Sequence, residues 1–271
     1  VSAPAMTKAI QKLEDELGVK LFERTTRRVT LTENGSAVLR RAREALAQVD
    51  EIATDLDALR DDVSGELRIG AMEVFSVRVL PRAVASLVRE HPKVVPLAYE
   101  MHPESMQRHL VDGLLDVAFT IGAPTSKGIH TESIGESRGQ IVCGRAHPLY
   151  KSGRITRAAL LDFPFVVPRF FQREHLYSLD QFPEATYPRR VGATIELLQM
   201  MVELTMAGSY LGYFPELSIA HHLSSGALRA LKGLRGLPTF GLYAWTRRGG
   251  ATKRSARALI DAVLSSLSEA G

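Results

Sequence analysis

Cysteine is almost absent from this chain, because Cys143 is the single cysteine among 271 residues. One thiol excludes a disulfide framework within the chain and suits the reducing cytoplasm, where we expect the protein to work. Cys143 follows Ile141 and Val142 in an apolar run, so we interpret it as a small buried residue. No stretch approaches the ~20 apolar residues of a membrane span, and the start has no signal-peptide layout. We therefore expect no membrane partner.

Recognisable catalytic motifs are also missing. The sequence has no Gly-x-Ser-x-Gly elbow, no phosphate-binding loop, no Gly-x-Gly-x-x-Gly fingerprint and no His-Glu-x-x-His pair. His221 and His222 are adjacent, so on a helix they would point to different faces and could not readily share a metal ion. We therefore expect no enzyme activity, no cofactor and no metal, and look instead for binding surfaces.

The first thirty residues combine a half-apolar helix with a basic ribbon. Ser2 is a good helix N-cap, Pro4 suits the first turn and Gly18 is placed to end the helix. One face is apolar and is expected to be buried, at Ala5, Ala9, Ile10, Leu13 and Leu17. The opposite face has no acid and carries Ser2, Thr7, Lys8, Gln11 and Lys12. The residues from Val19 to Thr30 then read as a β-ribbon with a basic tip, so the layout indicates a winged helix-turn-helix.

This stretch closely resembles the DNA-binding signature of LysR-type transcriptional regulators. That family has a Ser-x-Pro-Ala-x-Ser/Thr helix, then Leu-Glu-x-x-Leu-Gly, Leu-Phe-x-Arg and Leu-Thr-x-x-Gly. The matching residues are Ser2, Pro4, Ala5, Thr7, Leu13, Glu14, Leu17, Gly18, Leu21, Phe22, Arg24, Leu31, Thr32 and Gly35. The chain opens inside this signature, and a family member would carry about one further helix pair before it. We therefore expect an N-terminally incomplete sequence that dimerises and binds an effector better than it binds DNA.

Ten residues are candidates for contact with double-stranded DNA. They are Ser2, Pro4, Ala5, Thr7, Lys8, Gln11, Lys12, Arg24, Arg27 and Arg28. Thr7, Lys8 and Gln11 face outward near the start of the helix and are the candidates for reading bases. Hydroxyl and cationic side chains also bind phosphates, and we assign that role to Ser2, Lys12, Arg24, Arg27 and Arg28. The alternative is that Ser2 only caps the helix and Arg24 is only a surface charge.

A long helix is predicted from Thr32, its N-cap, to about Leu59. Apolar residues recur in steps of three and four, at Leu39, Ala42, Leu46, Val49, Ala53 and Leu56, with Ile52 and Leu59 beside them. Such a narrow seam is typical of a helix that pairs with a second copy. The alternative is a helix packed on its own domain. Residues 61–65 then read as a hinge.

From Gly65 onward the chain alternates short apolar strands with amphipathic helices, which indicates a doubly wound, largely parallel α/β sheet. Strands are expected at 66–71, 94–101, 116–121, 134–135, 140–144, 163–167, 210–214, 227–231 and 237–245. Helices are expected at 77–90, 104–112, 155–161, 194–207, 215–224 and 252–268.

The order of these elements also resembles the LysR-type effector domain, which is similar to the two-lobed periplasmic binding proteins. The resemblance implies an α/β fold with an N-terminal all-α winged helix-turn-helix and a linker helix. It implies a winged-helix part at 1–31 and a dimerisation helix and hinge at 32–64. Lobe I would comprise 65–136 and 247–271, and lobe II 137–246.

A ligand site is expected where the strands end at the cleft between the lobes. The candidate residues are Glu73, Ser76, His102, Ile121, Arg169, Phe171 and Thr194. Ser76 and Thr194 would cap helices and offer a hydroxyl, or cap and do nothing more. Many effectors in the family are small carboxylates, which Glu73 would repel. Glu73 therefore points outward, pairs with a basic residue, or faces a neutral or cationic effector.

The resemblance implies a dimeric or tetrameric transcriptional regulator that binds promoter DNA and responds to a small molecule. RNA polymerase would be a further partner of an activator. Two other classes share the two-lobed fold. A solute-binding protein would carry an export signal and no winged helix, and an α/β enzyme would need a clustered catalytic set.

Overall fold

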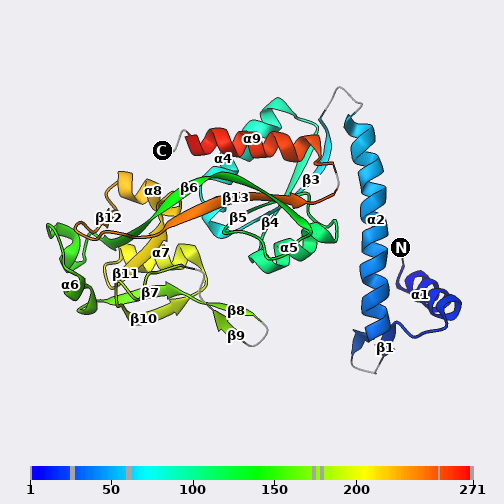
Figure 1. The fold of residues 1–271 in the computed structure, drawn as a ribbon, viewed down its shortest axis with the longest axis horizontal. Coiled ribbons are helices and arrows are strands. Elements are labelled where there is room, and N and C mark those ends of the chain that lie inside the picture. The colour runs from blue at the N-terminus through cyan, green and yellow to red at the C-terminus, as the bar shows by residue number, and fades with distance from the viewer. Residues whose placement is uncertain are drawn as a thin grey trace.

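The computed structural model describes residues 2–24, 28–58, 63–172, 175–177, 180–249 and 251–268. A helical N-terminal part lies to one side, and two α/β lobes follow it (Figure 1). The long helix α2 (Glu33–Ala58) connects the two parts. The α/β architecture with an N-terminal helix, ribbon and linker helix agrees with the expectation from the sequence.

Helix α1 (Ala3–Leu17) forms from the predicted stretch. Ser2 occupies the N-cap position, but its hydroxyl makes no capping hydrogen bond. Gly18 ends the helix in the left-handed conformation at φ 67°, which glycine adopts at low cost. The predicted ribbon is strand β1 (Phe22–Arg24) paired antiparallel with β2 (Val29–Leu31). Its tip, residues 25–27, lies outside the described residues, as does Val1.

The apolar face of α1 is not buried as expected. Leu13 is 38% exposed and Leu17 is 47% exposed, while Ile10 is half-buried. Glu14 is instead the one buried residue of the helix. The reason is that none of the described elements of this chain packs over the apolar stripe, so the stripe remains a surface feature.

Glu14 fastens the ribbon to the helix. Its carboxylate accepts hydrogen bonds from the backbone N–H groups of Leu21 (2.8 Å) and Phe22 (3.2 Å) and from Lys20 Nζ (3.0 Å). The hydrogen bond from Lys20 and those from the two amides lower the pKa of Glu14. This contribution to stability is therefore present at neutral pH and is lost as the pH falls through that lowered pKa.

Thr32 and Gly35 fix the start of α2 against the same loop. The Thr32 hydroxyl donates to the carbonyl of Lys20 at 2.7 Å and accepts from the N–H of Gly35 at 2.9 Å, which confirms Thr32 as the N-cap. A Cβ atom on Gly35 would lie 2.0 Å from the carbonyl oxygen of Leu21. Only glycine permits this approach of helix and loop.

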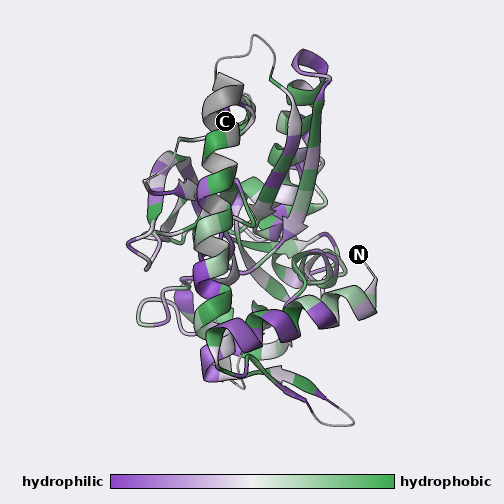
Figure 2. Ribbon diagram, turned by 90° about the vertical axis from the view of Figure 1, so that its right-hand side faces the viewer, coloured by the Kyte–Doolittle hydropathy of each residue, from purple (hydrophilic) through white to green (hydrophobic). Residues whose placement is uncertain are grey.

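Helix α2 presents its predicted seam to solvent. Its 26 residues span about 39 Å at 1.5 Å per residue. Leu46, Val49 and Ile52 are 65%, 60% and 61% exposed. Apolar and polar bands alternate along the helix, which stands beside the lobes (Figures 1 and 2). The side chains of Ala53 and Leu56, and residues 59–62 of the seam and hinge, lie outside the described set.

Lobe I is built on the parallel strands β3, β4 and β5. Its elements in order are β3 (Gly65–Ala71), α3 (Glu73–Ser76), α4 (Val79–Glu90), β4 (Val94–Glu100), α5 (Pro103–Val111) and β5 (Val117–Ile121). Strand β3 pairs with both β4 and β5. The C-terminal helix α9 (Arg254–Ser268) packs beside α4 over this sheet (Figure 1).

Lobe II is built on the parallel strands β7, β10 and β11. Its elements are a 3-10 turn (Pro148–Lys151), α6 (Arg157–Leu161), β7 (Pro164–Pro168), β8 (Phe170–Gln172), β9 (His175–Tyr177), β10 (Arg190–Ile195), α7 (Leu198–Met206), β11 (Leu211–Pro215), α8 (Glu216–Ser224) and β12 (Leu228–Ala230). Strand β7 pairs with β10 and β11. Each lobe therefore has its own apolar core, centred on Phe75 and Phe119 in lobe I and on Phe165 and Phe240 in lobe II.

Two long strands, β6 (Ile129–Gly144) and β13 (Thr239–Arg247), run through both lobes (Figure 1). The expectation of two short strands at 134–135 and 140–144 is wrong, because one 16-residue strand covers both. It pairs with β13 as far as Arg138 and with β11 from Gly139 onward. Its two halves therefore belong to different lobes, and the change of partner between Arg138 and Gly139 marks the boundary between them.

The expectation of a helix from Thr194 is also wrong. Thr194 lies on strand β10, and α7 begins four residues later at Leu198. Ser76 likewise caps no helix N-terminus, because it is the last residue of α3 and donates to the carbonyl of Glu73 at 2.8 Å. The sequence also does not predict the β8–β9 hairpin. The first amides of α7 donate to Glu73 of lobe I, which lies 125 residues away in the sequence. A local sequence pattern therefore does not predict where this helix begins.

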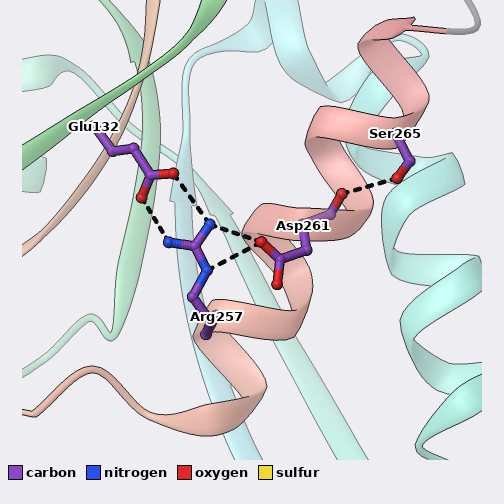
Figure 3. A network of polar contacts seen from close by, with 4 residues as sticks. All are labelled: Glu132, Arg257, Asp261 and Ser265. Atoms are coloured by element: carbon purple, nitrogen blue, oxygen red, sulfur yellow. Dashed lines mark hydrogen bonds and ion pairs between the residues drawn. The ribbon is translucent and has the colours of Figure 1, made fainter.

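An ion-pair network holds the last helix on lobe I (Figure 3). Arg257 of α9 donates to both carboxylate oxygens of Glu132 on β6, at 2.6 and 3.1 Å, and to Asp261 at 2.8 and 3.1 Å. Ser265 donates to the carbonyl of Asp261 at 3.1 Å. The two carboxylates raise the pKa of Arg257, so the guanidinium stays charged. Residues 125 positions apart in the chain are thereby joined.

Replacing Glu14 by alanine tests the attachment of the ribbon. The change removes the acceptors of the Leu21 and Phe22 amides, so their hydrogen exchange should accelerate by about tenfold or more. Glu16→Ala is the matched control, since Glu16 is exposed and lies 3.7 Å from Lys12 alone. Exchange mass spectrometry or NMR reports both variants. Equal exchange at Leu21 and Phe22 in the two variants would show that Glu14 does not hold the ribbon.

Candidate functional site

The leading face of α1 is an exposed polar surface. Thr7, Lys8 and Gln11 are all exposed and lie within one helical turn of one another. The Thr7 hydroxyl donates to the carbonyl of Ala3 at 3.0 Å, and its second lone pair stays on the surface. Lys12 is exposed next to them and pairs with Glu16 at 3.7 Å. Ser2, Pro4 and Ala5 are exposed in the first turn.

The ribbon adds further cationic side chains near α1. Arg24 on β1 and Arg28 before β2 are exposed, whereas Arg27 lies outside the described residues. Figure 1 shows α1 and the ribbon beside the lower part of α2, away from the end that leads into β3. Nine of the ten candidate DNA contacts therefore lie on exposed positions of the N-terminal part, on α1 and at the base of the ribbon. Such a basic helix-and-ribbon surface suits phosphate and groove contacts.

A cavity of about 290 Å³ lies between the lobes, where parallel strands of both lobes end. Its lining residues come from both lobes: Met72, Glu73, Val74, Glu100, Met101, His102, Ile121, Pro168, Asp180, Glu196, Leu197, Leu198, Met201, Tyr213, Phe214, Pro215 and Phe240. Most of them are apolar, and the polar ones are mainly carboxylates. A concave apolar site with a few polar groups is the usual form of a small-molecule site.

Glu73 joins the two lobes directly. Its carboxylate, at the start of α3 in lobe I, accepts hydrogen bonds from the backbone N–H groups of Leu198 (2.6 Å) and Gln199 (3.2 Å) in lobe II. These amides belong to the first turn of α7, where N–H groups have no partner within the helix. Leu197 at the N-cap position has no side-chain oxygen. Glu73 is therefore the cap of α7, supplied from the other lobe, and its negative charge also suits the helix dipole.

A second contact crosses the cleft beside it. His102 Nε2 of lobe I lies 2.9 Å from Glu196 Oε1 of lobe II, and this contact is an ion pair when the imidazole is protonated. Glu100 lies close to both groups. Burial raises the pKa of Glu100, and the charges of Glu73 and Glu196 raise it further, while His102 lowers it. Three carboxylates from three strand ends, two of lobe I and one of lobe II, therefore line the same cavity.

Tyr213 of β11 also lines the cleft, and its hydroxyl has no hydrogen-bond partner among the described residues. The side chain is only 2% exposed, with its ring between Phe182 (5.1 Å) and Phe240 (5.8 Å). Burial raises the pKa of Tyr213, so the hydroxyl stays protonated. A Cβ atom on Gly139 would lie 2.1 Å from this hydroxyl, so glycine at the point where β6 changes lobes makes room for it.

The expected ligand residues divide into two groups. Glu73, His102 and Ile121 line the cavity, whereas Ser76, Arg169 and Thr194 do not and are exposed. Phe171 lies on β8, but its side chain is outside the described set.

Several lining residues are not predicted from the sequence. They are Glu100, Asp180, Glu196 and Tyr213. Glu100 ends β4 and Glu196 follows β10, so the strand-end rule would have found both once the strands were bounded correctly. Because a helix is expected from Thr194, Glu196 is expected within that helix and not at a strand end, so it is not a candidate.

Cys143 is not a reactive site. It is fully buried and free, and burial raises the pKa of its thiol to about 11. Within the described ranges, no group of three or more His, Cys, Asp or Glu side chains is arranged to hold a metal ion. Over the same ranges, no helix has both the length and the apolar character to cross a membrane.

Two family models match the chain. One, for the LysR substrate binding domain, covers residues 60–268, and the other, for the bacterial regulatory helix-turn-helix protein of the lysR family, covers residues 1–36. The chain is 30% identical over 241 residues to an SDS degradation transcriptional activation protein of Pseudomonas sp. (strain ATCC 19151), covering 88% of this chain and 78% of the relative. It is 27% identical to the HTH-type transcriptional regulator PtxR of Pseudomonas aeruginosa, with 90% and 78% covered.

Solved structures share the fold along the whole chain. A full-length OxyR variant from Pseudomonas aeruginosa superposes with a TM-score of 0.77 at 20% identity, covering 97% of this chain and 86% of that one. Full-length CbnR complexed with its target DNA superposes with a TM-score of 0.66 at 22% identity, covering 98% and 91%. The helix, ribbon, linker and two-lobed cleft thus occur in the order that both family models describe, and the chain belongs to the LysR family of transcriptional regulators.

Proposed function

We propose that this LysR-type regulator binds operator DNA through α1 and the ribbon and responds to a small molecule in the cleft between its lobes. One observation supports this most strongly: a single chain carries an exposed cationic helix face and, beyond a linker helix, a cleft bridged by polar contacts from both lobes. It acts by binding and not by catalysis. A solute-binding protein or an α/β enzyme of this fold would have no use for the helix and ribbon.

On the DNA, Thr7, Lys8 and Gln11 would reach base edges from the exposed start of α1. Ser2, Pro4, Ala5 and Lys12 would lie along the phosphates, and Arg24, Arg27 and Arg28 would hold the backbone from the ribbon. CbnR, a structural relative with a TM-score of 0.66, has been solved in complex with its target DNA, which supports DNA binding by a chain of this fold.

The assembly would be a homodimer or homotetramer in the cytoplasm, paired through the exposed seam of α2. Two winged-helix parts held by a pair of linker helices suit an operator with dyad symmetry. RNA polymerase would be a further partner where the protein activates. The corresponding domains are the winged-helix part at 1–31, the linker at 32–64, lobe I at 65–136 and 247–271, and lobe II at 137–246.

The effector would act on the distance between the lobes. Glu73 is held by α7 and His102 by Glu196, so both contacts favour one arrangement of the cleft. A ligand shifts such an equilibrium only by its difference in affinity for the two arrangements. Of the expected effector residues, Glu73, His102 and Ile121 would contact it, with Ser76, Arg169, Phe171 and Thr194 farther along the strand ends.

The ribbon arginines give the first test of DNA binding. In the natural full-length protein, Arg27→Ala with Arg28→Ala should weaken binding to all DNA sequences alike and reduce the slope of log affinity against log salt by about 1 to 2. Fluorescence anisotropy on operator and scrambled DNA measures both quantities. Lys127→Ala with Lys151→Ala, two exposed lysines on the lobes, is the control. Lost discrimination with unchanged general affinity would contradict a phosphate role.

The linker seam has its own test. Leu46→Asp with Val49→Asp places two charges on the exposed apolar face of α2 and should dissociate dimers, because burying unpaired carboxylates is unfavourable. Arg40→Asp with Gln48→Asp adds the same number of acids elsewhere on the helix and should leave dimers intact. Light scattering gives the mass. A dimeric mass for the seam variant would remove α2 from the interface.

Glu73→Ala tests the bridge between the lobes. The variant leaves the first amides of α7 without acceptors, so Leu198 and Gln199 should exchange about tenfold faster or more, and the radius of gyration from X-ray scattering should rise. Glu203→Ala on the same helix is the control, because the Glu203 carboxylate accepts from the Gln199 side chain, at 2.8 Å, and not from the first amides of α7. Unchanged exchange at Leu198 in Glu73→Ala would mean that the lobes are held by other contacts.

A further inference from the structure

The charges that line the cleft are predominantly negative. Glu73, Glu100 and Glu196 come from three strand ends. Burial raises the pKa of Glu100, and the negative charges of Glu73 and Glu196 raise it further. The charge of Glu73 is engaged by the amides of α7. Glu100 and the second carboxylate oxygen of Glu196 are therefore best placed to meet a ligand, since His102 Nε2 lies 2.9 Å from the other oxygen, Oε1.

Basic side chains do not offset this charge among the described lining residues, which include four carboxylates, one imidazole and neither lysine nor arginine. Asp180, the fourth carboxylate, has its own cation, because Arg189 pairs with it and stacks over Phe182 at 4.1 Å. Arg169 is exposed and does not line the cavity. An anionic ligand would meet like charges here, and the described part of the lining offers no lysine or arginine to bind it.

The remaining lining is apolar and adaptable. Met72, Met101 and Met201 contribute flexible thioethers, and Ile121 and Phe240 contribute hydrocarbon surface. A bare metal ion or a fully hydrated cation would gain nothing from these side chains. The surroundings instead fit an apolar body attached to a positively charged group, within a cavity of about 290 Å³.

The Tyr213 hydroxyl is an observation independent of the carboxylates. Tyr213 is one of the lining residues, its hydroxyl oxygen is shielded from solvent, and the described residues give that oxygen no hydrogen-bond partner. Buried polar groups are nearly always hydrogen-bonded, so an unpartnered hydroxyl at a cavity indicates a ligand atom that bonds to it. The ligand would then carry a second, polar group in addition to its cation.

We propose that the effector is an organic ammonium ion with an apolar body, its cationic group held by Glu100 and Glu196 and a second polar atom bonded to Tyr213. The proposal rests on the proposed function, since it names the ligand class of the same cleft. A cationic ligand also agrees with the position of Glu73. Its carboxylate caps α7, and its negative charge would attract a cation to the cavity.

Matched probes test the class of ligand. Triplets that share one body and differ only in the end group are compared, namely the ammonium, carboxylate and alcohol forms of butyl, phenylethyl and 4-hydroxyphenylethyl compounds. Calorimetry and thermal shift on the natural full-length protein measure binding. The ammonium member should bind about tenfold or more tightly than its partners in at least one triplet. If no ammonium compound binds more tightly than its carboxylate counterpart, the proposal is wrong.

Four variants, one of them a control, locate the bound ligand. Glu100→Gln and Glu196→Gln should each weaken the preferred ammonium compound about tenfold or more, whereas Glu66→Gln, the same change at an exposed site on β3, should have no effect. Tyr213→Phe should abolish any preference for the hydroxyl-bearing amine over its phenyl counterpart. Equal weakening by Glu66→Gln, or none by Glu100→Gln and Glu196→Gln, would overturn the assigned site.

DNA binding is measured in parallel to keep the two proposals apart. Salt-sensitive, sequence-selective binding together with a preference for carboxylate probes would reject the cationic effector and leave the regulator intact. Ammonium binding without any sequence-selective DNA binding would instead reject the proposed function and retain the ligand class.

Discussion

One carboxylate, that of Glu73, joins the two lobes through the helix amides that it caps. Helix α7 starts with N–H groups that its own residues cannot satisfy, and the acceptor comes from lobe I across the cleft. Because this contact crosses the cavity, a change in the separation of the lobes would also change whether the first amides of α7 have a hydrogen-bond acceptor. A ligand that moves Glu73, or that adds charge beside it, changes the stability of the closed arrangement.

In the N-terminal part, too, a side-chain carboxylate accepts hydrogen bonds from backbone amides of a neighbouring element. Glu14 accepts from the Leu21 and Phe22 amides, and Thr32 bonds the neighbouring loop at both its hydroxyl positions. The glutamate and threonine of the family signature therefore hold the ribbon against α1 and α2, while the side chains proposed to touch DNA remain on the surface. The ribbon is thus held by Glu14 and Thr32, while Arg24 and Arg28 lie on its exposed surface, where cationic side chains suit phosphates.

Local sequence patterns predict the elements whose signals lie within a few residues. The helix before Gly18, the cap at Thr32 and the strand–helix order from β3 onward are of this kind. The sequence does not predict that 190–195 is a strand, since the cap of α7 lies 125 residues away. For the same reason the sequence does not predict that Thr194 lies on a strand and that Glu196 follows its end. Glu73, His102 and Ile121, by contrast, are predicted by the rule that ligands bind at strand ends. The unpartnered Tyr213 hydroxyl depends on packing by Phe182 and Phe240, which no short motif encodes.

We propose that the protein recognises specific DNA sequences through α1 and the ribbon. Footprinting of the natural protein on its own genome, at several salt concentrations, gives the sharpest test of this recognition. Protected sites with approximate dyad symmetry are expected, and their occupancy should fall steeply as salt rises. Uniform protection without sequence preference, or no protection at low salt, would contradict it.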